Sequence, residues 1–245
     1  MARRTFLLVL VWLQLLVPLL SYARARSGTS VVSISQGKLR GVIIGNTSVY
    51  ANIPYAAPPV KELRWRPPQR PSGWSGVRDA TSFGPQCRQP SGAGVEDCLQ
   101  LNVFTPLGTT PSSKLPVMVW IHGGAFQTGS AVDFTLQNMT NYLEGQVVAV
   151  SVNYRLNIFG FLGSENLRQR SPDGGTGNYG IQDQRAALQW VQENIHAFGG
   201  DKDKVTIFGE SAGAGSVTNH LVQRKSFPFF RAAIMVGFER CQSEP

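Results

Sequence analysis

The stretch Val205-Thr206-Ile207-Phe208-Gly209-Glu210-Ser211-Ala212-Gly213 decides the fold of this chain. Its first four residues predict a strand, and residues 214–223 can form a helix. Between them stands Gly-x-Ser-x-Gly, the pattern of a nucleophile elbow, which is a sharp and strained turn from strand to helix. Small flanking residues let the serine hydroxyl stand clear of the backbone, and the N–H groups of the following helix point at a reacting carbonyl. We expect such a serine to perform acyl transfer when a histidine can take its proton.

A second glycine turn supports this interpretation. His122-Gly123-Gly124-Ala125-Phe126 follows directly after an apolar run, upstream of Ser211. Glycine removes the Cβ that would keep a backbone N–H away from a developing oxyanion. With the N–H of Ala212, this turn would supply two or three donors. Alone, the double glycine would be an ordinary turn at the end of a strand, but beside the elbow it predicts an oxyanion hole.

Apolar runs and glycine or proline breaks predict the other elements. The predicted strands are Val31 to Ser35 and Lys38 to Ile44, which form a hairpin, then Leu101 to Thr105, Leu115 to Ile121, Val147 to Asn153 and Arg231 to Val236. Asp183 to Phe198 predicts a helix with one apolar face, and Tyr50 to Pro71 predicts irregular packing. Unbroken apolar runs favour strands buried on both faces. Strands alternating with helices then predict a mostly parallel, doubly wound α/β sheet.

The N-terminus predicts a secretory signal peptide over residues 1–25. Arg3 and Arg4 precede an apolar run over residues 6–20, and small residues near Ala23 and Ala25 suit cleavage. A membrane anchor is the alternative, but the run is short for a span of about 20 residues. We therefore expect a secreted protein that does not stay inserted in the membrane, with one domain over residues 26–245.

The distribution of charge argues against nucleic acid as a partner. The chain has 23 Lys and Arg against 15 Asp and Glu, a net charge of +8. Because the basic residues are scattered, without a block of five or more, we do not expect nucleic-acid binding. The sequence does not indicate an oligomeric state.

Three cysteines and two sequons add expectations that follow from secretion. Cys87 and Cys98 bracket a short loop, and we pair them in a disulfide. Cys241 is left over, either as a free thiol or paired beyond the end of the chain. No spacing suggests zinc or another metal. Asn46-Thr47-Ser48 and Asn138-Met139-Thr140 are glycosylation sequons.

Further stretches are specific enough to show a resemblance. They are Glu96-Asp97-Cys98-Leu99-Gln100-Leu101-Asn102-Val103, Val119-Trp120-Ile121-His122-Gly123-Gly124-Ala125-Phe126, Asn153-Tyr154-Arg155-Leu156, Asn178-Tyr179-Gly180-Ile181-Gln182-Asp183-Gln184 and Phe198-Gly199-Gly200-Asp201. With the elbow, they make the chain resemble the type-B carboxylesterase/lipase family, whose relatives include cholinesterases. The resemblance runs from about Val31 to Val236 and implies an α/β-hydrolase fold.

The resemblance also implies roles for individual residues. Ser211 matches the nucleophile; Gly124, Ala125 and Ala212 match the oxyanion donors, with Gly123 shaping the turn. Cys87 and Cys98 match the first disulfide of the family, and Arg64 and Glu96 match a structural ion pair. The family hydrolyses small-molecule carboxylic esters through an acyl-enzyme, without cofactor or metal. A cholinesterase is disfavoured, because the loop between Cys87 and Cys98 is short and has no tryptophan.

The chain departs from the family pattern in its catalytic base. α/β-Hydrolases place the acid and the histidine after the serine, and the resemblance implies that both lie beyond Pro245. We expect His122 to pack, His196 to lie at the surface, His220 to point away from the elbow and Glu210 to face inward. The sequence therefore predicts an incomplete, N-terminal half of the fold, ending after the elbow helix and the next strand, with little activity alone. The alternative is an inactive product or a secreted binding or adhesion protein, although the full elbow argues against it.

Overall fold

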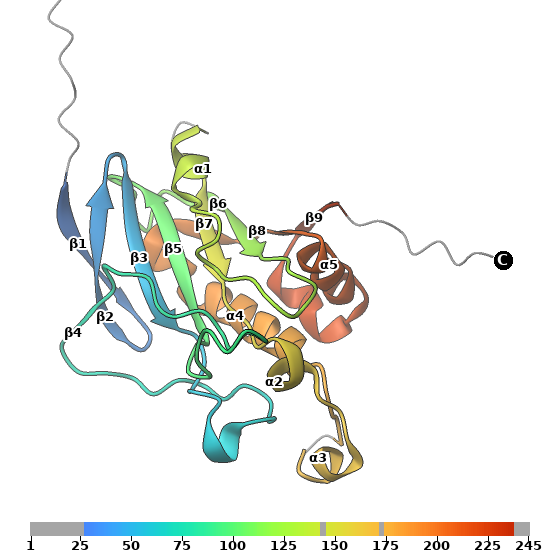
Figure 1. Ribbon diagram of the computed structural model, residues 1–245. Helices are drawn as coiled ribbons and strands as arrows, with labels where there is room; N and C mark the ends of the chain where they lie inside the picture. The colour runs from blue at the N-terminus through green and yellow to red at the C-terminus, as the bar shows by residue number, and fades with distance from the viewer. Residues whose placement is uncertain (1–26, 143–145, 172–173, 238–245) are drawn as a thin grey trace, which may run out of the picture.

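A mixed sheet forms the centre of the molecule (Figure 1). The computed structural model describes residues 27–142, 146–171 and 174–237. Within these ranges nine strands pair in the order β1-β2-β3-β5-β7-β6-β8-β9, with β4 beside β2. The strands are β1 (Ser27–Ile34), β2 (Gly37–Ile44), β3 (Thr47–Pro54), β4 (Val77–Asp79), β5 (Gln100–Pro106), β6 (Leu115–Ile121), β7 (Val148–Val152), β8 (Gly200–Glu210) and β9 (Ala232–Val236).

Short and long helices connect these strands. The α-helices are α1 (Gln137–Tyr142), α2 (Asn157–Phe161), α3 (Glu165–Gln169), α4 (Tyr179–Asn194) and α5 (Ala212–Val222), and the 3₁₀ turns are η1 (Lys61–Leu63), η2 (Ile195–Phe198) and η3 (Arg224–Phe229). No helix in the described ranges combines the length and the apolar character needed to cross a membrane.

The strand directions place two glycine turns side by side. β1, β2, β3, β5 and β7 pair antiparallel in succession, whereas β7, β6, β8 and β9 run parallel. Ile121, the last residue of β6, pairs with Gly209 near the end of β8. Because carboxyl ends of parallel strands meet at one edge, the turns that follow β6 and β8 become neighbours. The predicted α/β-hydrolase fold is confirmed.

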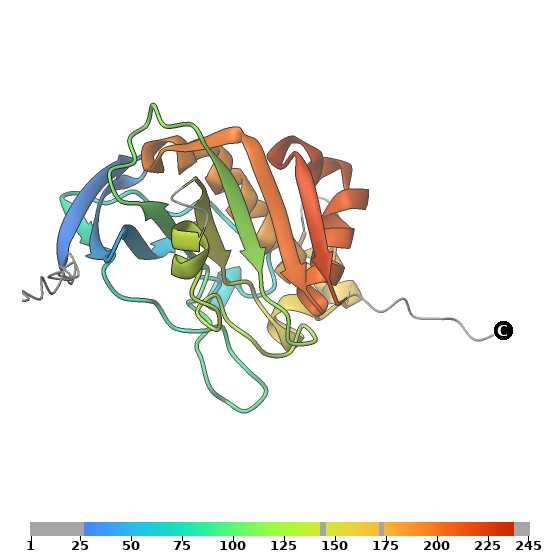
Figure 2. The same ribbon diagram turned by 90° about the horizontal axis from the view of Figure 1, so that it is seen from above.

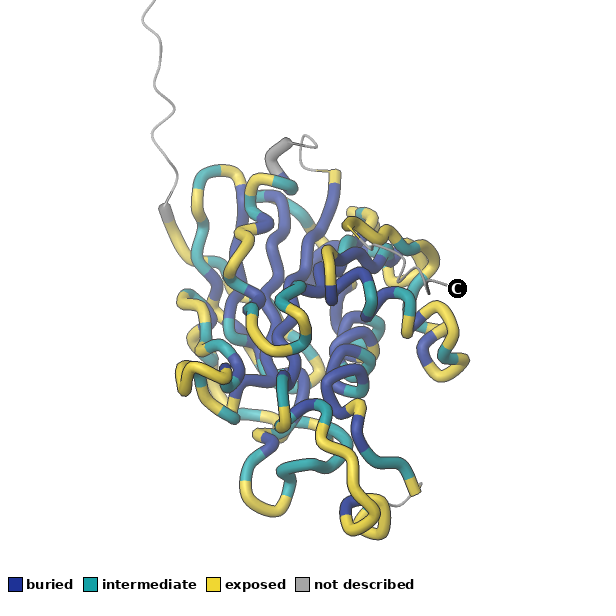
Figure 3. Tube along the Cα trace, turned by 45° about the vertical axis from the view of Figure 1, so that its right-hand side comes forward, coloured by how far each residue is buried: buried dark blue, intermediate teal, exposed yellow. Residues whose placement is uncertain are grey.

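Alternating side chains of the central strands fill two cores. Val119 and Ile207 belong to the larger core, which includes α4 residues such as Trp190 and Val191. Their chain neighbours Trp120 and Phe208 join a smaller core on the other face, which α1 covers. Figures 1 and 2 show α4 and α5 on one side of the sheet and α1 on the other. Figure 3 shows the buried segments concentrated in the central strands and α4.

Some predicted boundaries were wrong. Residues 50–54 are not irregular, because they lie in β3, whose Val49 and Tyr50 pair with β5 on one side of a register shift and Ile53 on the other. Helix α4 begins at Tyr179 rather than Asp183, and β8 begins at Gly200 rather than Val205. For β3 and β8, the pairing with distant strands that extends them leaves no local signal. The predicted signal peptide and Cys241 lie outside the described residues.

Candidate active site

Ser211 sits alone at the bend between β8 and α5. Its backbone has φ 56° and ψ −120°, in a region that non-glycine residues rarely adopt. Helix α5 begins at once, since Gly215 N–H donates to the Ser211 carbonyl over 3.0 Å. The Ser211 N–H donates to the carbonyl of Val236 at the end of β9, also over 3.0 Å. Ser211 is exposed, so the strained turn presents the serine at the surface of the sheet edge, as the elbow pattern predicts.

Both flanking glycines are required by close backbone contact. A Cβ on Gly209 would stand 2.5 Å from the carbonyl carbon of Gly213 and 2.7 Å from the Ile121 oxygen. A Cβ on Gly213 would collide with the same Ile121 carbonyl. The end of β6 therefore packs directly on the elbow, with no room for a side chain at either position.

The turn after β6, residues 122–130, is here named the glycine loop. A Cβ on Gly123 would lie 2.7 Å from the Glu210 carbonyl oxygen and 3.3 Å from Ser211 Cβ. Gly124 and Ala125 follow with φ 98° and 53°, and Ala212 adjoins Ser211 in the chain. The structure thus brings Gly123 directly to the serine and places the predicted donors Gly124, Ala125 and Ala212 in the two turns that meet there.

The predicted donor N–H groups have few competing partners. Within the described residues, no hydrogen bond uses the N–H of Gly123, Gly124 or Ala125. Ala212 is the first residue of α5, where a helix has no acceptor one turn earlier. These groups can therefore receive a negatively charged oxygen, although which of them do so remains a prediction.

The His122 side chain, at the start of the glycine loop, packs against Tyr154. Its ring stacks on Tyr154 at 4.3 Å between centroids, and Nδ1 lies 2.9 Å from the Gly123 oxygen. A carbonyl only accepts, so Nδ1 carries the proton. Burial lowers the pKa of His122 to about 4, and the ring is neutral near pH 7.

His220 belongs to α5 and is wholly buried. Its Nδ1 is 3.0 Å from Ser226 Oγ, and its Nε2 is 3.1 Å from Gln184 Oε1. Burial, together with the charge of Arg185, lowers the pKa of His220 to about 4. His196 is exposed in η2, before the amino end of β8 and so at the opposite end of that strand from Ser211. All three histidines of the sequence are thus accounted for.

The remaining expectations concern the disulfide, an ion pair, the two sequons and Glu210. The Cys87–Cys98 disulfide is present, and Arg64 Nε lies 2.6 Å from Glu96 Oε2. Asn46 and Asn138 are both exposed, which leaves glycosylation a prediction. Glu210 is exposed and does not face inward, because the residue before Ser211 lies where the turn leaves the sheet.

The sequence interpretation missed a buried ion pair. Arg155 Nε and Nη2 lie 2.7 and 2.6 Å from the carboxylate of Asp183, whose oxygen also accepts from the Arg155 N–H. Their side chains are 3% and 0% exposed. The pair ties the chain after β7 to α4. Both residues lie in stretches that carried the family resemblance, but that signal assigned them no role.

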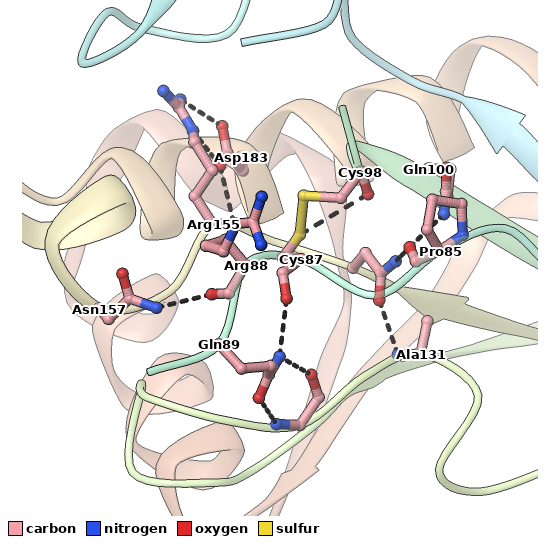
Figure 4. The surroundings of a disulfide bond; sticks show 12 residues. Pro85, Cys87, Arg88, Gln89, Cys98, Gln100, Ala131, Arg155, Asn157 and Asp183 are labelled. Carbon is pink, nitrogen blue, oxygen red and sulfur yellow. Dashed lines mark hydrogen bonds and ion pairs between the residues drawn. A yellow bond between two sulfur atoms is a disulfide. The ribbon is translucent and has the colours of Figure 1, made fainter. Parts of the chain in front are cut away.

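Remote polar side chains support the glycine loop (Figure 4). Gln89 contacts Gly129, and Asn153 Oδ1 accepts from the Ala131 N–H over 2.8 Å. Tyr154 Oη donates to the His122 carbonyl over 2.7 Å. The Asn157 N–H donates to the Phe126 carbonyl, also over 2.7 Å. Across residues 27–142, 146–171 and 174–237, no three His, Cys, Asp or Glu side chains gather as a metal site.

Comparison with known proteins agrees on the family and the fold. The profile described as "Carboxylesterase family" matches residues 28–240. The para-nitrobenzyl esterase of Bacillus subtilis is 43% identical over 84% of this chain and 43% of its own. The cAMP-regulated D2 protein of Dictyostelium discoideum is 42% identical over 93% of this chain and 44% of its own.

A solved structure gives the same result. The carboxylesterase EST55 of Geobacillus stearothermophilus superposes with a TM-score of 0.77 at 46% identity. The match covers 84% of this chain and 42% of that protein. The chain therefore spans about two fifths of the length of the proteins it matches.

Proposed function

This chain belongs to the carboxylesterase family, and we propose that it contributes the nucleophile and the oxyanion hole to the hydrolysis of small-molecule carboxylic esters. The single observation that carries the proposal is Ser211, exposed at a strained turn against the Gly123 peptide. Ester hydrolysis requires such a hydroxyl next to N–H donors that can receive charge.

The proposed reaction proceeds through an acyl-enzyme. Ser211 Oγ loses its proton to a base and attacks the ester carbonyl carbon, whose π electrons move onto oxygen. The N–H groups of Gly124, Ala125 and Ala212 stabilise that oxyanion, and each such donor is typically worth about 10²–10³ in rate. The intermediate collapses, the alkoxy group leaves and takes up a proton as the alcohol, and water then releases the acid from Ser211. No cofactor takes part in these steps.

We propose that the base and its acidic partner come from outside residues 1–245. His220 already uses both ring nitrogens in its contacts with Gln184 and Ser226. His122 lies flat on Tyr154 with Nδ1 held by a carbonyl, and His196 is beyond the far end of β8. In the part of the chain that the structure describes, no hydrogen bond joins any of these rings to Ser211, which favours a base outside residues 1–245.

Secretion and glycosylation belong to the same proposal. Residues 1–25 have the composition of a signal peptide, and Asn46 and Asn138 are exposed as glycan acceptors must be. A mobility shift after glycosidase treatment of the secreted protein, lost in Asn46→Gln and Asn138→Gln, would test both.

Covalent labelling tests the catalytic proposal. A fluorophosphonate probe should label wild-type protein slowly at Ser211 and should not label Ser211→Ala. Turnover of p-nitrophenyl acetate by residues 1–245 should not exceed the residual catalysis of about 10³–10⁴ over water that remains without triad members. Fast, Ser211-dependent turnover would contradict the proposed external base. Folded protein without any Ser211 labelling would contradict the nucleophile and favour a binding protein of the same fold.

A further inference from the structure

Gln89 lies in the loop that the Cys87–Cys98 disulfide closes, and its side chain contacts the glycine loop (Figure 4). Its Nε2 donates to the Gly129 carbonyl over 3.1 Å, and its Oε1 accepts from the Gly129 N–H over 3.1 Å. Nε2 also donates to the Cys87 carbonyl over 2.8 Å. These partners fix the orientation of the amide, because two carbonyls need a donor and one N–H needs an acceptor. The side chain is only 7% exposed, so water does not readily replace these bonds.

Gly129 in turn lies against the start of the glycine loop. It has φ 102°, and a Cβ there would be 2.5 Å from His122 Nδ1 and 2.6 Å from the Gly123 oxygen. A Cβ on Gly123 would be 3.3 Å from Ser211 Cβ. The Gln89 side chain thus bonds Gly129, Gly129 approaches Gly123 too closely for a side chain between them, and Gly123 in turn lies close to Ser211.

The other end of this connection is firmly anchored. Gln89 stands two residues after Cys87, and its own N–H donates to the Ala93 carbonyl over 2.8 Å. Cys87 and Cys98 are both buried. The neighbouring Arg88 carbonyl accepts from Asn157 Nδ2 over 2.6 Å, and Asn157 also donates to the glycine loop through its N–H. Gln89 is thus the point at which a covalently closed loop holds a turn built from flexible glycine.

We propose that Gln89 is a positioning residue, which transmits the fixed position of the Cys87–Cys98 loop to Gly129 and holds the glycine loop in register with Ser211. The effect of Gln89 on the reactivity of Ser211 rests on the proposed function. The effect of Gln89 on the glycine loop does not, so the positioning proposal and the proposed function can fail separately.

The first measurement is amide hydrogen exchange at Gly129, resolved by NMR on the full chain. In Gln89→Leu the Gly129 N–H loses its acceptor and should exchange about tenfold faster, while amides 212–222 of α5 keep their rates. Cys87→Ala with Cys98→Ala leaves Gln89 present but releases its anchor, and should act in the same direction. Gln69→Leu removes an exposed side-chain amide that, among the residues the structure describes, bonds only the nearby Pro67 carbonyl, and it should leave Gly129 unchanged. Unaltered Gly129 exchange in Gln89→Leu would overturn the proposal.

A second readout separates positioning from general loosening. The rate of fluorophosphonate labelling at Ser211 should fall about tenfold or more in Gln89→Leu, with the affinity for the probe unchanged, because only the transition-state oxyanion needs the loop. Faster Gly129 exchange with an unchanged labelling rate would overturn the positioning role. If wild-type Ser211 does not label, the proposed function fails, and exchange at Gly129 alone decides. If Gln89→Leu does not fold, Gln89→Met replaces it, since a side chain of similar length then lacks the amide oxygen that accepts from the Gly129 N–H.

Discussion

Two glycine turns meet at the carboxyl ends of neighbouring parallel strands, yet different interactions hold them. The elbow after β8 is held by its own five residues, by Ile121 of the adjacent strand and by Val236 of β9. The glycine loop after β6 is held by side chains that lie far away in the sequence, among them Gln89 and Tyr154. Similar composition therefore does not imply a similar origin of rigidity. Close backbone packing against the neighbouring strands holds the elbow, whereas distant side chains add to the hydrogen bonds that the glycine loop makes within itself from the Gln127 and Thr128 N–H groups to the Gly124 carbonyl.

Each turn is nevertheless backed by a buried histidine. His122 begins the glycine loop, and His220 lies in the helix that follows the elbow. Both rings are neutral because burial lowers the pKa of each to about 4. The two turns therefore differ in which residues hold them and not in the charge of the histidine beside them.

The largest effect is expected from the buried ion pair of Arg155 and Asp183, which joins the chain after β7 to α4. Asp183→Asn leaves Arg155 buried without a counter-charge and should lower the free energy of unfolding by about 3–5 kcal/mol, measured by urea denaturation. Glu193→Gln is the matched control on the same helix. It breaks a pair with Arg70, which is 76% exposed, and should cost at most about 1 kcal/mol. Equal losses would contradict the distinction between buried and exposed support.

The elbow should fail by steric contact alone. Gly213→Ala places a methyl group against the Ile121 carbonyl, and we expect a loss of about 2–3 kcal/mol in unfolding free energy. Gly163→Ala is the control, since a Cβ there meets only Thr176 atoms at 3.9 Å or more. A Gly213→Ala protein of wild-type stability would show that close packing against the Ile121 carbonyl does not hold the elbow.

Acid should destabilise both turns through their histidines. In the unfolded chain each imidazole has a pKa near 6.5, whereas in the folded protein the pKa of His122 and His220 is about 4. The unfolded state therefore binds more protons as pH falls below 6.5, and stability decreases until about pH 4. At pH 5 the loss should be about 2 kcal/mol for each histidine.

NMR titration of the rings checks this pH dependence. The imidazole chemical shifts of His122 and His220 should stay constant between pH 7.5 and 5.5 in folded protein. A midpoint above pH 6 for either buried ring would contradict the prediction.

The smallest effect is expected from the loss of one hydrogen bond to the glycine loop. Tyr154→Phe removes the hydroxyl that donates to the His122 carbonyl over 2.7 Å and should cost about 1–2 kcal/mol. Amide exchange should rise in residues 122–130 and stay unchanged in 212–222. Equal acceleration in both segments would mean that the turns share one support.

Several elements were predictable because their signals are local. The run Leu115 to Ile121 forms a strand with the predicted bounds, and the hairpin about Gln36-Gly37 pairs as expected. The strand at residues 50–54 was missed, because its pairing with β5 across a register shift is a tertiary contact. Glu210 was misplaced because the direction in which the elbow turns out of the sheet cannot be read from five letters.

The sequence by itself indicated the elbow, since Gly-x-Ser-x-Gly between an apolar run and a helical stretch is the pattern of that strained turn. The contact with Ile121 that leaves no room for a side chain at Gly209 and Gly213 is a tertiary one. The tertiary structure alone decided which distant side chains hold the glycine loop. Gln89 and Gly129 are 40 residues apart, and Arg155 and Asp183 are 28 apart. Such hydrogen bonds and ion pairs follow no period along the chain, so only folding brings the partners together.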